Sequence, residues 1–209
     1  MTKTTTGTDR LLIETAKRLI PRYGVSNLSI RELAAAAHVN LGLFHYHFKT
    51  KNQFFTIVLQ EIYEKFFSEF SMEIAQGKNR KEQLRFAIEN FARFTKKHRG
   101  LFFALIRDAI NDEPCVLTFA KKNFARHGLI LLDLVGASKR KGKGRELDRI
   151  QMLVFLMAAI NGPLFAPEAI KRVFPGLGVF MRLWGSEESL ESENFLKMRI
   201  ELLMDTLFE

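Results

Sequence analysis

The sequence predicts an all-α fold, with a three-helix N-terminal head followed by a larger helical body, and three observations support this. Apolar residues recur at steps of three and four along most of the 209-residue chain, which is the period of amphipathic helices. Short clusters of Gly, Pro, Asn and Asp interrupt this pattern, as breaks between helices do. Segments with the alternating pattern of β-strands are scarce.

The composition is that of a soluble folded protein, with 47% apolar and 26% charged residues. The sequence has no run of about 20 apolar residues, so we expect no membrane span. The Thr-rich start lacks the apolar segment of a secretion signal, so we expect a cytoplasmic protein that does not bind membranes. Cys115 is the single cysteine, which excludes an intrachain disulfide. We expect it to be an inert packing residue, with a sensor thiol as the alternative.

The first helix is expected from Asp9 to Tyr23. Pro21 should distort its last turn, and Gly24 should end it. Its predicted buried stripe consists of Leu12, Ala16, Leu19 and Tyr23.

The second helix has the clearest start in the chain. Ser29 and Glu32 have the spacing of a capping box, in which each side chain bonds the backbone N–H of the other residue. Leu28 and Leu33 occupy the positions of a hydrophobic staple around this cap. After three residues Asn40 is a good N-cap for a third helix, over residues 41–48.

Six further helices are expected in the body. They cover residues 51–75, 80–97, 101–110, 115–137 and 146–161, and a final segment capped by Ser186. Gly162 and Pro163 should end the helix at 146–161, followed by a loop-rich stretch to residue 185 with a short helix around 168–173.

The basic residues are unevenly distributed. Residues 1–53 hold eight Lys and Arg against three Asp and Glu, and residues 134–185 hold nine against three. A basic N-terminal segment suits a polyanion such as DNA. The run at 139–145 is expected to be a solvated loop, with a secondary DNA or partner contact as the alternative.

Two short helices joined by a tight turn in a basic segment favour a helix-turn-helix, whose second helix enters the major groove of DNA. The spacing places Ile30, Leu33 and Ala34 inward, Val39 in the turn, and Phe44 and Phe48 against the second helix. An ordinary αα-hairpin in a helical core is the alternative.

The segment from Arg10 to Phe55 resembles the tetracycline-repressor (TetR) family of transcriptional regulators. The family pattern has an aromatic residue and Gly at the end of the first helix, here Tyr23 and Gly24. The match continues through Ser29-Ile30-Arg31-Glu32-Leu33-Ala34 and Ala37-His38-Val39-Asn40-Leu41-Gly42-Leu43-Phe44-His45-Tyr46-His47-Phe48-Lys49-Thr50-Lys51.

Three residues depart from the family pattern. His38 replaces the usual Gly, and His tolerates a left-handed backbone better than most other residues if the turn requires one. Asn40 replaces the usual Ser cap, which is chemically equivalent. His45 replaces the common Tyr that reaches the DNA backbone, and imidazole can still bond a phosphate.

The resemblance implies a head at residues 1–53 that binds double-stranded DNA, and it implies a role for ten residues. Leu41, Gly42 and Leu43 would face the groove, while His45, Tyr46 and His47 would reach phosphates or base edges. Lys51 and Ser29 would meet the DNA backbone, and Arg31 would contact the backbone or a guanine. For Tyr46, His47 and Leu43 a packing role is the alternative. The implied DNA-binding residues are Ser29, Arg31, Asn40, Leu41, Gly42, Leu43, His45, Tyr46, His47 and Lys51.

The body, residues 54–209, would supply dimerisation, because one head has too small a footprint for tight binding to a palindromic operator. In the resembling family the last two long helices pair with those of a second copy. The stripes that could do so are Ile150, Leu153, Val154, Met157 and Ala158, and Leu196, Ile200, Leu203 and Leu207. The alternative is that they form only intrachain core.

The body is rich in Phe, with 20 in the chain, and could enclose a small, largely apolar effector. The existence of such a pocket rests mainly on the resemblance, and ordinary core is the alternative for each residue. The candidates are Phe91, Phe94, Phe102, Phe103, Arg107, Phe124, His127 and Asn161, with Asp108 as a further polar group.

No metal-ligand constellation, phosphate-binding Gly loop or catalytic motif is recognisable, so we expect neither an enzyme nor a cofactor. The favoured hypothesis is a DNA-binding repressor that a small effector releases from its operator. The alternative is a DNA-binding regulator whose body docks a protein partner, and a helical enzyme is the least favoured.

Overall fold

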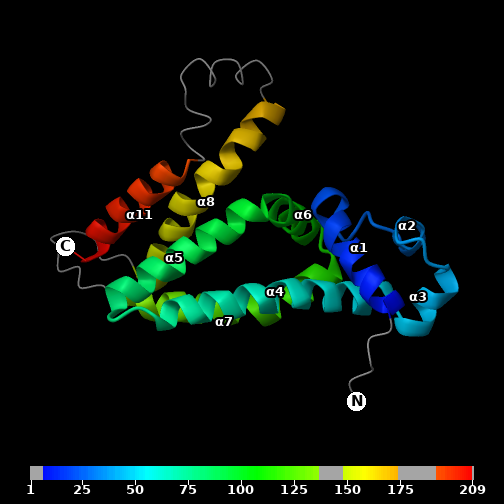
Figure 1. The fold of residues 1–209 in the computed structure, drawn as a ribbon. Coiled ribbons are helices and arrows are strands. Elements are labelled where there is room, and N and C mark those ends of the chain that lie inside the picture. The colour runs from blue at the N-terminus through cyan, green and yellow to red at the C-terminus, as the bar shows by residue number, and fades with distance from the viewer. Residues whose placement is uncertain (1–6, 137–147, 174–191, 209) are drawn as a thin grey trace. The chain divides into compact units, whose positions relative to one another are not determined.

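The computed structural model describes residues 7–136, 148–173 and 192–208, and these ranges contain helices and turns but no strand (Figure 1). This confirms the all-α fold. The described helices are α1 (Gly7–Tyr23), α2 (Ile30–Ala36), α3 (Leu41–His47), α4 (Lys51–Ala75), α5 (Arg80–Lys97), α6 (Arg99–Ile110), α7 (Pro114–Gly136), α8 (Arg149–Val173) and α11 (Glu193–Phe208).

Helix α8 is longer than the sequence predicts. It continues through Gly162 and Pro163 to Val173, so the expected stop at 162–163 is wrong. A proline inside a helix costs about 3 kcal/mol, because it removes one backbone hydrogen bond and crowds the preceding turn. Ile160 and Leu164 are buried on either side of the proline, and this burial offsets that cost. The expected loop at 139–145 and the cap at Ser186 lie outside the described residues.

The chain divides into two compact units. The first unit consists of Met1–Phe67 and His98–Arg126, and the second of Ser68–Lys97 and His127–Glu209. The first unit is wider than the predicted head because its buried core also includes residues of α4, α6 and α7, such as Phe54, Leu101 and Cys115. A functional boundary after residue 53 remains a prediction.

The core of the first unit forms around α1, which packs against α2, α3 and α6. Leu12, Ala16 and Ile20 lie on its inner face and are fully buried. Tyr23 does not complete this stripe as expected, because its side chain is 39% exposed. Instead the guanidinium of Arg22 lies 5.2 Å from the centre of the Tyr23 ring, at the surface.

The core of the second unit forms between α5, α8 and α11, which lie side by side in Figure 1. The predicted stripe of the last helix is buried there, so it is intrachain core. Other apolar side chains of α8 and α11 face outward and are 53–68% exposed: Ile150, Val154, Phe155, Met198 and Leu202.

Within the ranges described, no helix is both long and apolar enough to cross a membrane.

Candidate nucleic-acid interface

The start of α2 is formed by the predicted capping box. The Glu32 N–H donates to Ser29 Oγ at 3.1 Å, and the Ser29 N–H donates to Glu32 Oε2 at 3.0 Å. The Ser29 hydroxyl also donates to Glu32 Oε2 at 2.6 Å, and these bonds from Ser29 lower the pKa of Glu32. Leu28 and Leu33, the expected staple, are both buried. Local sequence therefore sets where α2 begins.

The turn between α2 and α3 is a Schellman motif. The His38 N–H donates to Ala35 O at 3.1 Å, and the Val39 N–H donates to Ala34 O at 2.9 Å. His38 has a φ of 53°, so this turn does require a left-handed backbone at the position where the family pattern has Gly. Val39 is partly buried against the core. The turn thus connects α2 to α3 through residues 37–40.

Helix α3 begins at its predicted cap, because Asn40 Oδ1 accepts the Gly42 N–H at 2.8 Å. Phe44 and Phe48 anchor the inner side of the helix and are buried at 0% and 6% exposure. Both rings contact Phe54, with ring centres 5.2 and 4.7 Å apart. These aromatic contacts fix which side of α3 faces outward.

The outer side of α3 is open to solvent. Tyr46 is 72% exposed and Leu43 is 44% exposed, and Gly42 and His45 are also exposed. Leu41 and His47 are half-buried at the edges of this surface. The four exposed residues include polar, aromatic and apolar groups, which suit contacts with phosphates and base edges.

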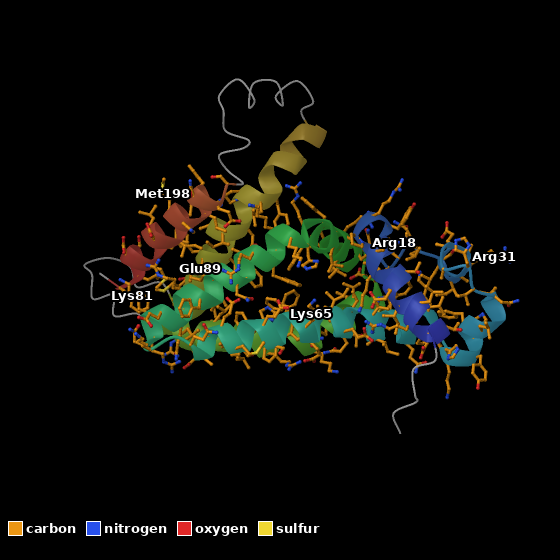
Figure 2. The ribbon with its side chains drawn as sticks, in the orientation of Figure 1. Arg18, Arg31, Lys65, Lys81, Glu89 and Met198 are labelled. Carbon is orange, nitrogen blue, oxygen red and sulfur yellow. The ribbon has the colours of Figure 1, made fainter. Side chains whose placement is uncertain are left out.

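Basic residues flank α3. Arg31 of α2 is exposed, and Figure 2 shows its side chain extending away from the helices. Lys49 is also exposed. Lys51 is half-buried, and its Nζ donates to Ser26 O at 2.9 Å. An ammonium group has three donors, so this bond leaves Lys51 able to reach a phosphate.

The caps Ser29 and Asn40 are exposed, but their oxygens bond backbone or carboxylate groups within the head. The Asn40 amide NH₂ keeps its two donors. Thr50 was not among the predicted residues of this segment. Its Oγ1 accepts the Gln53 N–H at 3.1 Å and caps α4. Its position two residues after Phe48 and directly before a helix was the available signal.

The residues expected to line an effector pocket fall in different units. Phe91, Phe94, His127 and Asn161 belong to the second unit. His127 is buried there beside the Phe91 ring, with ring centres 5.9 Å apart. The others, which belong to the first unit, are Phe102, Phe103, Arg107 and Phe124.

Two first-unit candidates have other surroundings. Phe124 is 58% exposed, and Arg107 donates to the backbone of the head. Asp108 was expected to be a polar group of the pocket, and this expectation is wrong. It is fully buried against Val25 and Ser26 of the head, whose N–H groups bond its carboxylate.

Two buried polar residues of α5 were missed. Asn90 and Thr95 are 6% and 1% exposed, and Asn90 Oδ1 and Thr95 Oγ1 have no hydrogen-bond partner among the described residues. The same holds for Asn161 Oδ1 of α8. Thr95 lies four residues after Phe91, on the buried side of α5. This spacing could have identified it from the sequence as a polar residue on an apolar helix face.

The described part of the chain contains no group of three His, Cys, Asp or Glu residues placed to hold a metal ion. Cys115 is buried, and this burial raises the pKa of its thiol.

Residues 12–56 match the family model for bacterial regulatory proteins of the tetR family. A curated relative, the probable HTH-type transcriptional regulator YttP of Bacillus subtilis (strain 168), is 22% identical over 164 residues. The match covers 78% of this chain and 79% of the relative.

Solved structures share the fold along almost the whole chain. A transcriptional regulator from Rhodococcus sp. Rha1 superposes with a TM-score of 0.68 at 17% identity, covering 97% of this chain and 96% of that one. AibR, solved in complex with isovaleryl coenzyme A and operator DNA, gives a TM-score of 0.63 at 17% identity, with 96% and 98% covered.

The capped α2, the tight left-handed turn and the outward side of α3 form a helix-turn-helix, and the family model covers this same segment. Over residues 12–56 the chain is therefore similar to bacterial regulatory proteins of the tetR family, and its fold is shared with solved transcriptional regulators.

Proposed function

We propose that the protein is a repressor that binds a palindromic operator as a homodimer and leaves it when a small, largely apolar effector binds the body. The observation that carries the DNA-binding part is the outward side of α3, where Leu43 and Tyr46 are exposed while Phe44 and Phe48 anchor the helix. A helix held in this way can enter the major groove without losing core contacts.

Each exposed group has a matching partner on DNA. Leu43 suits an apolar contact with the methyl group of thymine. Because Gly42 has no side chain, the backbone of α3 could approach the base edges closely. Tyr46, His45 and His47 offer donors and acceptors for phosphates or bases. Leu41 would also face the groove, and further contacts to the DNA backbone would come from Ser29, Arg31, Asn40 and Lys51.

The dimer would form through the outward apolar residues of the second unit. Ile150 and Val154 of α8 are 65% and 62% exposed, and Met198 and Leu202 of α11 are 60% and 68% exposed. Figure 2 shows Met198 pointing away from its helix to the outside of the chain. Large apolar side chains gathered on two adjacent helices favour burial against a second copy.

The effector would bind within the second unit. Buried polar atoms are normally hydrogen-bonded, and each exception needs an explanation. Asn90 Oδ1, Thr95 Oγ1 and Asn161 Oδ1 are such exceptions among the described residues, on two helices that pack together. These three oxygen atoms would accept hydrogen bonds from the few donor groups of a largely apolar ligand, whose apolar part would contact Phe91, Phe94 and His127.

Selection from a random-sequence DNA library tests the DNA-binding part. The wild-type protein should enrich a sequence with two-fold symmetry, and the enriched duplex should bind more tightly than its scrambled version. Enrichment of no sequence would contradict the proposal.

Lys51→Ala tests a phosphate contact in the interface. The variant should bind all duplexes more weakly, and the slope of log affinity against log salt should fall in magnitude by about 1. Lys65→Ala is the matched control, since Lys65 is exposed on α4 (Figure 2) and its loss removes the same charge. Equal slopes in the two variants would remove Lys51 from the phosphate contacts.

A panel of neutral apolar compounds tests the effector part. A compound that raises the melting temperature by binding the body should also weaken operator binding, because the two effects are linked. Stabilising compounds that all leave operator affinity unchanged would exclude release by an effector of this class.

A further inference from the structure

Asp108 of α6 is a fully buried carboxylate that binds the linker between α1 and α2, residues 24–29. Its Oδ2 accepts the Val25 N–H at 2.6 Å and the Ser26 N–H at 3.4 Å, and its Oδ1 accepts the Ser26 hydroxyl at 2.7 Å. A charged group is retained in a protein interior only when such bonds replace its hydration. The Asp108 carboxylate therefore holds the linker in place through these hydrogen bonds.

Arg107, the preceding residue of α6, binds the residue just before this linker. Its Nη2 donates to the carbonyl oxygen of Tyr23 at 2.5 Å. Tyr23 is the last residue of α1, where carbonyl groups lack partners inside the helix and positive charge is favourable. Two consecutive residues of α6 thus hold the chain on both sides of Gly24.

Gly24 allows this close approach. It has a φ of 80°, and a Cβ built on it would lie 2.3 Å from Arg107 Nη2 and 2.7 Å from Asp108 Oδ1. Any other residue at this position would displace the Arg107 guanidinium and the Asp108 carboxylate and would strain the backbone at this positive φ.

Ser26 extends the contact to the far end of the helix-turn-helix. Its carbonyl oxygen accepts a hydrogen bond from Lys51 Nζ at 2.9 Å. Ser26 precedes α2 and Lys51 follows α3, so this bond joins the two ends of the motif. Asp108 therefore binds a helix-turn-helix whose two ends are already joined by the bond between Lys51 and Ser26.

We propose that Asp108 and Arg107 are positioning residues for DNA recognition, which fix the linker and so the angle at which α3 meets the groove. They touch the backbone of the head, and the DNA contacts belong to other residues. This inference rests on the proposed operator binding.

Asp108→Ala removes the acceptors of the linker. The test measures the affinity for the selected operator and for a scrambled duplex at several salt concentrations. The affinity for the operator should fall at least about fivefold, the equivalent of one lost base contact, while scrambled DNA binds as before with the same salt slope. A merely structural role would leave the ratio of the two affinities unchanged in the folded variant.

Asp108→Asn is the conservative variant. Its amide oxygen can accept both linker N–H groups, and its NH₂ can donate to the Ser26 hydroxyl, which rotates to accept. The ratio of the two affinities should return close to the wild-type value. Asp112→Asn, in the exposed turn after α6, is the control for the change in charge.

Arg107→Met decides the question if Asp108→Ala does not fold. Arg107 lies at the surface with its side chain 45% exposed, so its replacement should spare the fold. The ratio should fall as for Asp108→Ala, whereas Lys97→Met, which loses the same charge in the second unit, should not change it. Wild-type ratios in folded Asp108→Ala and Arg107→Met proteins would overturn this inference and leave operator binding intact, whereas a wild-type protein without a preferred sequence would overturn both.

Discussion

Ser29 and Glu32 decide, as single residues, where the helix-turn-helix begins. Each satisfies a backbone N–H of the other that would otherwise lack a partner at the start of α2. The Glu32 carboxylate is also favoured by the positive end of the helix dipole. The bond that Glu32 accepts from the Ser29 N–H and its attraction to the helix dipole are both strongest when the Glu32 carboxyl group is charged.

Glu32→Gln should give a stability difference that depends on pH. Because Ser29 holds the pKa of Glu32 below its ordinary value of 4.5, the carboxylate stabilises the fold fully above that pH. This contribution is lost as pH falls through the lowered pKa. Melting temperatures between pH 3 and pH 7 should therefore favour the wild type at pH 7 and converge in acid. A constant difference, or the same pattern in the surface variant Glu69→Gln, would contradict the assignment.

Thr95 illustrates a residue whose burial opposes stability. Replacing it with the isosteric Val removes a buried hydroxyl whose oxygen has no partner among the described residues. The free energy of unfolding should rise by about 1 kcal/mol, measured by urea denaturation. Thr56→Val is the matched control and should lower it, since the Thr56 hydroxyl donates to Asn52 O at 2.7 Å. Destabilisation by both variants would show that Thr95 Oγ1 is bonded.

The turn between α2 and α3 acts at the scale of an element, because it sets how the recognition helix leaves its scaffold. His38 adopts a left-handed conformation there with an exposed side chain. For residues with a Cβ this conformation costs about 1–2 kcal/mol. The Schellman bonds of the turn hold the residue in place despite that cost.

His38→Gly should therefore stabilise the protein, by about 0.5–1 kcal/mol after the added chain entropy of Gly is subtracted. Ala35→Gly places the same residue in the exposed interior of α2 and should destabilise by about 1 kcal/mol. Thermal or urea unfolding of the pair distinguishes backbone strain from a general effect of Gly. A loss of stability in His38→Gly would mean that the His side chain itself supports the turn.

At the scale of the whole molecule, the outward residues of α8 and α11 predict a dimer. Val154→Glu places a charge among exposed apolar side chains, so the protein should become monomeric in analytical ultracentrifugation and lose operator affinity. Leu129→Glu on α7, where Leu129 is 65% exposed, is the control and should remain dimeric. A Val154→Glu protein that is still dimeric would place the interface elsewhere.

Most of the helices could be predicted from the sequence because their limits are set by local chemistry. The ends of α4 and α5 lie where the breaks at residues 49–50 and 76–79 place them, and the caps at Ser29 and Asn40 form as expected. Each cap involves residues no more than three apart, so no distant contact is needed to form it. The length of α8 could not be predicted, because the cost of Pro163 is offset by burial against other helices.

The candidate DNA-binding residues were also predictable as a segment, since α3 is short and its position follows from the motif. Which of them face outward depends on how Phe44 and Phe48 pack against Phe54. For Asp108 the sequence indicated only a polar residue near a Phe-rich helix. Its partners, Val25 and Ser26, lie more than 80 positions away in the sequence.

The amino-acid order alone determined the helical class and the capped α2 and α3, because these depend on backbone groups a few residues apart. The tertiary structure decided the outward side of α3, the burial of the α11 stripe and the attachment of Asp108 to the head. Such contacts join distant residues, and whether they form depends on the packing of the entire chain.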